Sequence, residues 1–205
     1  MMHRALDAIT QRVSANHFDP AFTIDDAAIH ELISYAIEAP SAYNLQNWRF
    51  IAARSAQRKK DLMALAYGQE KVADAAVTFI VCGVLEPHRG IRAAMHGFQE
   101  DGHIGPDFLE EWVDEATSAY QDKPGKQRDE AIRSASLAAM NLMIAAHAMG
   151  LASGPMIGFD AKAVSVDFGL APTEIPVMLV AVGRAAPGNW PRKRRRPVVE
   201  VLDVV

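Results

Sequence analysis

The chain of 205 residues is half hydrophobic and 22% charged, which excludes wholesale disorder and leaves room for one domain with a sizeable core. Its net charge is −4 although residues 192–196 are all basic, and an acidic body with one basic run is not typical of a general nucleic-acid binder. The single cysteine excludes an internal disulfide. We therefore expect a soluble, cytoplasmic protein whose residues 1–205 form one domain, with no signal peptide and no membrane span.

The first third of the chain mixes helical and strand patterns. Apolar residues at helical spacing predict a helix over 4–11, and a capping-box pattern at 23–26 predicts the start of a second helix that ends at Pro40. A strand is expected at 48–53, followed by a helix over 55–66.

The segment 76–85 predicts a strand that is apolar on both faces, which is typical of the middle of a covered sheet. We expect Cys82 to be packed in it as core, because a buried cysteine behaves as a small hydrophobe. Residues 91–121 have a helical but polar and aromatic pattern, which Gly102 and Gly105 interrupt.

The longest regular element is predicted over 128–149, with Gly150 as its C-terminal cap. Its apolar residues cover more than one stripe, so we expect the helix to be buried on most sides. One domain of this size rarely surrounds a helix, and a subunit interface is therefore expected to cover part of it. A last strand at 175–182 precedes a proline-rich, basic tail, and the irregular spacing of strands and helices favours an α+β fold.

Several common catalytic signatures are absent from the sequence. There is no Gly-rich dinucleotide fingerprint, Walker loop, HExxH or GxSxG motif, and the seven histidines show no metal-ligand spacing. We therefore expect no metal site and no side-chain nucleophile paired with a base.

Three separated polar segments remain, at 12–16, at 39–48 and in the tail around Lys193 and Arg195. Arginine and serine early in the chain, with lysine and arginine at its end, are suited to hold a phosphate. The middle segment offers amides suited to the hydrogen-bonding edge of a planar ring. Each segment also has a plain structural interpretation, as a helix end, as a turn, and as a solvated tail or nucleic-acid patch.

Together these segments resemble a known family. Residues 39–50 resemble the APSxxNxQPW signature of the FMN-dependent nitroreductases, and residues 154–160 are similar to the glycine-bearing segment that faces the flavin in that family. The resemblance extends to the strand at 176–183 and to the tail at 195–197. Phrases shared with a small bacterial subgroup of NAD(P)H nitroreductases, some linked to quinone detoxification, occur at 66–67, 119–121 and 136–140.

The resemblance implies an α+β fold with a central mixed sheet flanked by helices. It further implies an intertwined homodimer with two FMN sites at the subunit interface. Arg12 and Ser14 would contact the phosphate and ribityl end of FMN, and Lys193 and Arg195 would close on the phosphate.

The other end of the cofactor would meet different segments. Gln69 would lie near the pyrimidine edge of the flavin, and the backbone of Ile157 and Gly158 would address flavin N5. The residues expected along the isoalloxazine or ribityl chain, contributed by the partner subunit, are Pro40, Ser41 and Asn44.

Two positions depart from the family pattern. Asn16 stands where the family commonly has a second arginine or lysine, near flavin N1 and the C2 carbonyl. It can donate a hydrogen bond but brings no charge, so weaker stabilisation of the anionic reduced flavin is expected. Asn47 replaces the proline of the QPW triplet, which is expected to affect loop stiffness more than chemistry.

The activity that the resemblance implies is that of an FMN-dependent NAD(P)H oxidoreductase. It would reduce quinones or nitro compounds by ping-pong hydride transfer, with NADH or NADPH as donor and no catalytic side chain. Its partners would be a second copy of the chain and a small-molecule electron acceptor, with no nucleic acid and no membrane. The alternatives are a specialised reductase of the same fold, acting on semialdehydes, enones or halogenated compounds, and a non-enzymatic flavin- or nucleic-acid-binding protein.

Aromatic residues are candidates for the wall of a substrate pocket above the flavin. For all but the first of them, plain packing explains the residue equally well. The candidates are Tyr43, Phe98, Phe108, Trp112 and Tyr120.

Overall fold

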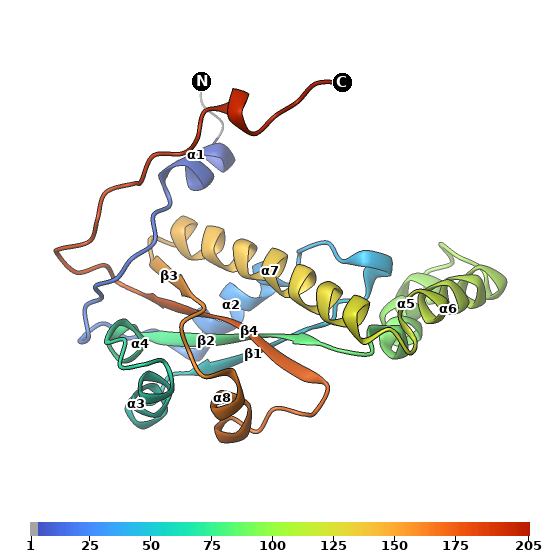
Figure 1. The fold of residues 1–205 in the computed structure, drawn as a ribbon, viewed down its shortest axis with the longest axis horizontal. Helices are drawn as coiled ribbons and strands as arrows, with labels where there is room; N and C mark the ends of the chain where they lie inside the picture. The colour runs from blue at the N-terminus through green and yellow to red at the C-terminus, as the bar shows by residue number, and fades with distance from the viewer. Residues whose placement is uncertain (1–3) are drawn as a thin grey trace.

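Residues 4–205 are described by the computed structural model, in which a four-stranded sheet lies between two layers of helices (Figure 1). The strands are β1 (Trp48–Ala53), β2 (Val77–Val84), β3 (Ala152–Met156) and β4 (Glu174–Gly183), in the order β1-β2-β4-β3. The α+β class is confirmed. The expectation of a mixed sheet needs a correction, since all three strand pairings are antiparallel and parallel pairing enters through a bridge between Ser14 and Ser153.

The helices cover both faces of this sheet. α2 and α7 pack on the face that bears Phe79, whereas α3, α4 and α8 cover the face that bears Cys82. The helices are α1 (Arg4–Gln11), α2 (Asp26–Ala36), α3 (Ala56–Leu65), α4 (Lys71–Asp74), α5 (Ile91–Glu100), α6 (Pro106–Tyr120), α7 (Pro124–Ala148) and α8 (Ala161–Asp167). Short 3-10 turns lie at Ala42–Asn44, Pro87–Gly90 and Val198–Glu200.

β2 lies inside the sheet and belongs to both cores. Successive side chains of a strand point to opposite faces. Val77, Phe79 and Val81 accordingly pack under α2 and α7, and Ile80 and Cys82 pack under α3 and α8. All five are fully buried, which confirms the prediction that this strand is covered on both sides and that Cys82 is core.

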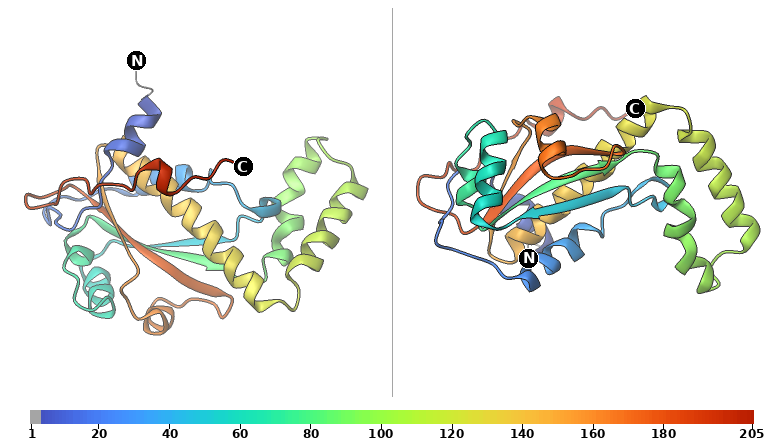
Figure 2. Two further views of the ribbon diagram at one scale, coloured as in Figure 1. Left: turned by 45° about the horizontal axis from the view of Figure 1, so that its top comes forward. Right: turned by 90° about the horizontal axis from the view of Figure 1, so that it is seen from below.

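α5 and α6 project from one end of the sheet and have a small core of their own (Figure 2). That core includes Leu45, which comes from the loop before β1. Glu130 of α7 is only 2% exposed and accepts hydrogen bonds from the Tyr120 hydroxyl at 3.2 Å and from Ser134 Oγ at 3.0 Å. The pair of helices is therefore attached to the body at the polar loop on one side and at a buried carboxylate on the other.

Most predicted elements are confirmed, with differences at the helix ends. The cap of α2 is Asp25, whose carboxylate accepts a hydrogen bond from the Ala28 amide at 2.8 Å, and the helix ends at Ala36 rather than at Pro40. α7 begins at Pro124 rather than at 128, because proline suits the first turn of a helix. The structure adds α4, α8 and β3 to the elements expected from the sequence.

The segment that follows α1 and the segment that follows β4 lie beside each other. Phe18 forms a bridge with Ala185, and the Asp19 amide donates to the Arg184 carbonyl at 2.9 Å. α1 and the C-terminal segment leave the body on the same side (Figure 1). This arrangement brings the first and third polar segments of the sequence together.

Candidate functional site

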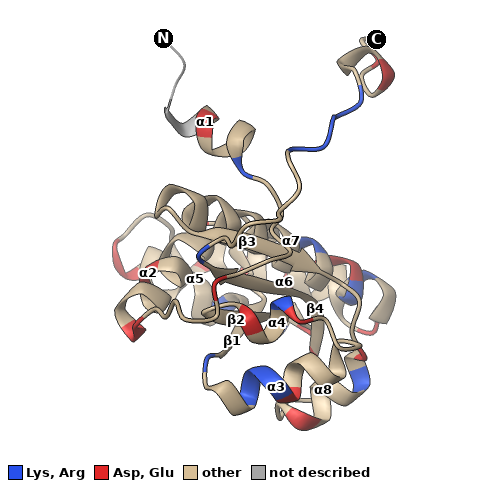
Figure 3. Cartoon of the chain, turned by 90° about the vertical axis from the view of Figure 1, so that its left-hand side faces the viewer, with Lys and Arg blue, Asp and Glu red and all other residues tan. Residues whose placement is uncertain are grey.

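A pocket of about 190 Å³ lies between the end of α1 and the C-terminal tail. The early and late polar segments meet here, since residues about 180 positions apart line the pocket together. Figure 3 shows how Lys and Arg gather along this part of the tail. We refer to this pocket as the cation cradle; its lining residues are Arg12, Val13, Ser14, Asn16, Trp190, Pro191, Arg192, Lys193 and Arg195.

The cation cradle is electrostatically unbalanced. Four of its nine lining residues are cationic and none is acidic. Arg12 has two buried nitrogens, Nε and one terminal amino group, for which residues 4–205 provide no hydrogen-bond partner. Burial, followed by the charges of Arg195 and Arg192, lowers the pKa of Arg12. Unpaired buried donors among like charges are costly unless an anion completes them, so the chemistry of the donor set fits a phosphate.

The tail is fastened to the end of α1 by Arg192. Its guanidinium donates to the carbonyl of Ile9 at 3.2 Å and to that of Thr10. These carbonyls lie in the last turn of α1, where a cation is favoured by the helix dipole. Arg192 therefore serves the geometry of the cradle, a role that the sequence interpretation did not assign to it.

A second pocket, of about 370 Å³, adjoins the cradle and shares Asn16 with it. Lys71 Nζ donates to Asn16 Oδ1 at 3.2 Å, and burial lowers the pKa of Lys71. The position where the family pattern has a cation thus holds an amide, and a lysine from α4 contacts that amide. The sequence interpretation missed Lys71, although it stands two positions after Gln69, which it had selected.

Gln69 and Gly158, which the resemblance assigns to different parts of the flavin, are in direct contact. Gln69 Nε2 donates to the Gly158 carbonyl at 2.7 Å and to the Ala66 carbonyl at 3.1 Å. Ile157, next to Gly158, is 78% exposed just beyond the end of β3. Ile157 is therefore accessible from solvent, and Gly158 is held by Gln69, which lines the second pocket.

The central polar loop lies apart from both pockets. Pro40, Ser41 and Asn44 line neither of them in this chain. Tyr43, Asn44 and Gln46 all have positive φ, at 51°, 55° and 46°, a conformation that non-glycine residues adopt rarely. Ser41 Oγ accepts the Gln46 amide at 2.9 Å and so stabilises the tight turn. Backbone strain of this kind is found at ligand sites, where surrounding contacts maintain it.

The predicted aromatic residues form one cluster and one outlier. Tyr43 meets Trp112 and Tyr120 edge to face, each at 6.4 Å between ring centres, and Phe108 lies 5.2 Å from Trp112. Tyr120 is buried, and burial with the nearby Glu130 carboxylate raises its pKa to about 12. Phe98 instead lies against His103. Tyr120 thus serves packing, whereas Phe98 and Phe108 are 47% and 43% exposed.

Asn47 extends the pairing of β1 with β2 beyond the strands. Its side-chain amide donates to the Val84 carbonyl at 3.1 Å, while the Val84 amide donates to the Asn47 carbonyl at 2.8 Å. Asn47 is 4% exposed. The residue that departs from the family pattern therefore anchors the end of the strained loop through its side chain, which a proline could not do.

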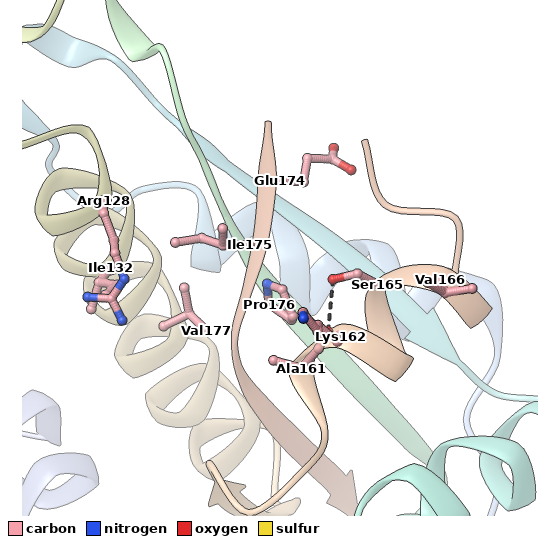
Figure 4. Close-up of a pocket in the computed structure, with 10 residues that line it drawn as sticks. All are labelled: Arg128, Ile132, Ala161, Lys162, Ser165, Val166, Glu174, Ile175, Pro176 and Val177. Atoms are coloured by element: carbon pink, nitrogen blue, oxygen red, sulfur yellow. Dashed lines mark hydrogen bonds between the residues drawn. The ribbon is translucent and has the colours of Figure 1, made fainter. Parts of the chain in front are cut away.

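A larger pocket, of about 670 Å³, lies between α7, α8 and the start of β4 and contains none of the predicted site residues (Figure 4). Residues 4–205 hold no group of three or more His, Cys, Asp or Glu side chains placed to bind a metal ion. None of the helices within this range combines the length and the hydropathy needed to cross a membrane.

Comparison with known proteins identifies the family. A profile described as "Nitroreductase family" matches residues 9–184. "Putative NAD(P)H nitroreductase YodC" of Bacillus subtilis is 31% identical over 184 residues, which cover 90% of this chain and 91% of YodC. The chain belongs to the nitroreductase family, which places it among the oxidoreductases.

Solved structures agree with this assignment. The crystal structure of ydfN of Bacillus subtilis, described as a putative nitroreductase, superposes with a TM-score of 0.92 at 30% identity and covers 98% of each chain. A nitroreductase-like structure from Exiguobacterium sibiricum, solved in complex with FMN, has a TM-score of 0.90 at 24% identity over 100% of this chain and 99% of its own. The α+β nitroreductase fold that the resemblance implies is confirmed for the single chain.

Proposed function

We propose that this chain is an FMN-dependent NAD(P)H oxidoreductase that reduces quinones or nitro compounds. The observation that carries the proposal is the cation cradle, in which Arg12 has buried donors without a partner among three further cations. A phosphomonoester supplies the missing acceptors and the missing negative charge. Family membership and the FMN held by a structural neighbour support the same cofactor.

In the proposed complex, different segments of the chain would meet the different parts of FMN. Arg12, Ser14, Lys193 and Arg195 would hold the phosphate. At the opposite end, Gln69, Lys71 and Asn16 would meet the pyrimidine edge, and the backbone of Ile157 and Gly158 would meet the central ring. Pro40, Ser41 and Asn44 line neither pocket of their own chain, so a second copy would supply them.

When bound, FMN supplies the redox chemistry, by taking a hydride from NADH or NADPH and passing it to the acceptor. The residues of this chain bind, orient and polarise. Lys71 supplies a positive charge beside Asn16. The aromatic cluster of Tyr43, Phe108 and Trp112, which a second copy would bring to the site with the polar loop, would give an apolar surface that excludes water. The proposed ping-pong sequence of hydride transfers would require no side-chain acid or base.

The experiment that tests the proposal begins with colour. A yellow preparation whose absorbance is bleached by NADH or NADPH, followed by parallel-line kinetics with a quinone or a nitroaromatic acceptor, is the expected result. A chain that stays colourless with added FMN and binds DNA would instead support the non-enzymatic alternative. An enone or semialdehyde that turns over faster than every quinone and nitro compound would favour a specialised reductase.

We further propose that the protein is an obligate homodimer. Leu137, Ile144 and Ala148 follow one another at helical spacing on one side of α7, which residues 4–205 cover only in part: Leu137 is 41% exposed, Ala148 is exposed and Ile144 is half-buried. The tail adds exposed apolar side chains, with Val199 85% exposed. A second chain that covers both surfaces would bury more than about 2,000 Å², the size of permanent interfaces.

Charging this stripe is expected to separate the subunits. Leu137→Glu combined with Ile144→Glu places two carboxylates in the proposed interface, where they lose hydration without gaining a partner. Light scattering is expected to show a monomer that retains little FMN, because the loop with Ser41 and Asn44 no longer reaches the cofactor. Lys60→Glu, on the outer side of α3, is the control. A stable, FMN-loaded monomer of the unaltered chain would contradict the proposal.

Lys71 is expected to set the reduction potential of bound flavin. Two-electron reduction leaves negative charge over N1 and the C2 carbonyl, and a nearby cation stabilises that charge. Lys71→Met is therefore expected to lower the two-electron potential by about 30 mV or more, where 30 mV corresponds to about 1.4 kcal/mol. Asn16→Ala, which removes the amide but keeps the lysine, is expected to lower it less, and Asn16→Arg to raise it. Spectroelectrochemical titration of variants fully loaded with FMN measures this potential. Equal potentials for Lys71→Met and the unaltered protein would show that Lys71 does not influence the reduction of the flavin.

A further inference from the structure

Asn189 has an unusual set of hydrogen bonds where the segment after α1 meets the segment after β4. Its Oδ1 accepts the amide of Asn16 at 2.7 Å and the amide of His17 at 3.0 Å. Its Nδ2 donates to the carbonyl of His17 at 2.8 Å and to that of Ala186 at 2.9 Å. Two acceptor sites and two donors are the whole capacity of a carboxamide, so this side chain is fully used.

The contacts of Asn189 continue a backbone ladder that would otherwise stop. Phe18 pairs with Ala185, and the Ala186 amide donates to the His17 carbonyl at 3.0 Å. The chain then turns at Gly188, whose φ of +95° is readily adopted by glycine. Asn189 follows directly, and its side chain takes the place of the next backbone pair. In the described chain, neither the Asn16 nor the His17 amide has a backbone acceptor.

The hydrogen bonds of Asn189 connect the two segments that form the cation cradle, residues 12–16 and residues 190–195. In the N-terminal segment, Ser14 lies two positions before Asn16. In the C-terminal segment, Lys193 lies four positions after Asn189. At the far side, the halves are tied again by Arg192 at the end of α1. The like charges of the cradle repel one another, so the hydrogen bonds of Asn189 and Arg192 are needed to keep its two segments together.

We propose that Asn189 is a positioning residue that holds the two halves of the cation cradle at the separation a phosphomonoester needs, and thereby sets the preference for FMN over riboflavin. This inference rests on the proposed function. Riboflavin differs from FMN by the phosphate alone, and it makes no demand on the distance between Arg12 and Arg195. Asn16 keeps its separate contact with Lys71, so the far end of the flavin site depends less on Asn189.

The test compares both flavins in two variants and one control. Asn189→Ala is expected to weaken FMN by about tenfold or more, equivalent to about 1.4 kcal/mol, and riboflavin by less than about threefold. Asn189→Ser keeps one acceptor and is expected to lie between. Gln127→Ala is the control, since Gln127 also links two backbone segments, through the Glu86 amide and the Tyr120 carbonyl, but far from the cradle. Its ratio of FMN to riboflavin affinity is expected to equal that of the unaltered protein.

Hydrogen exchange gives a readout that does not depend on activity. In Asn189→Ala the amides of Asn16 and His17 are expected to exchange faster, while those of β2 stay protected. Equal losses for the two flavins, or unchanged FMN affinity, would overturn the role of Asn189. An unaltered chain that binds neither flavin would instead overturn the proposed function, so the two failures are distinguishable.

Discussion

Replacing Arg12 by alanine is expected to weaken FMN by about 3 kcal/mol, the upper end of the range for a hydrogen bond to a charged group. Two nitrogens of Arg12 are buried and have no partner within the described part of the chain, so their hydrogen bonds are available to a phosphate. Arg195 is exposed and already donates to the Lys193 carbonyl at 2.9 Å, so Arg195→Ala is expected to lose less, about 1.5 kcal/mol.

The same Arg12→Ala change is expected to raise the melting temperature of the FMN-free protein. Burial and the charges of Arg195 and Arg192 lower the pKa of Arg12, which means that the fold disfavours its charged form. Removing that charge is therefore expected to raise the free energy of unfolding of the FMN-free protein. Sites of this kind hold a binding group at a cost in stability.

Calorimetry of the apoprotein and titration with FMN and riboflavin check both expectations. Arg89→Ala is a suitable control, because Arg89 is 71% exposed and its ion pair with Glu86 lies outside the cradle. A lower melting temperature of FMN-free Arg12→Ala, with equal losses for the two flavins, would mean that Arg12 supports the fold rather than the phosphate.

The parts of the fold that the sequence predicts are those with a strong local pattern. β1 matches the prediction at both ends because Trp48–Ala53 combines aromatic and β-branched residues between a turn and a helix cap, and Ser55 caps α3 through the Arg58 amide at 3.2 Å. β3 was not predicted as a strand. Its sequence, Ala-Ser-Gly-Pro-Met, has low strand propensity, and only its pairing with β4 makes it one.

The residues of the candidate site likewise differ in how far the sequence alone predicts them. The meeting of Arg12 and Ser14 with Lys193 and Arg195 could be predicted from residue types that suit a phosphate, together with the resemblance. Lys71 and Asn189 could not. A lysine in a short helix and an asparagine after Pro-Gly are ordinary surface residues until the tertiary fold brings Asn16 to both.

Gly154→Ala is expected to be the most disruptive single methyl group added near the site. A Cβ at Gly154 would lie 2.3 Å from the carbonyl oxygen of Ala15, which is backbone and cannot rotate away. Ala15 lies between Ser14, which bridges to Ser153, and Asn16, which meets Lys71. The added methyl therefore drives the N-terminal segment away from β3, at an overpacking cost of about 1–3 kcal/mol of unfolding free energy.

The loss should reach the cradle as well as the fold. The Ala15 amide donates to the Ser153 carbonyl at 2.9 Å, so a shift of this segment breaks its contact with β3 and displaces Ser14 and Arg12 from their positions in the cradle. Denaturant unfolding of the apoprotein measures the stability, and FMN titration measures the site. The matched control is Gly97→Ala in α5, where an added Cβ meets nothing within 4 Å. Alanine is the better helix former, so this variant should gain about 0.5–1 kcal/mol and keep its FMN affinity. If Gly154→Ala were as stable as the unaltered protein and bound FMN equally well, the close approach of Ala15 to β3 would not be what fixes the cradle.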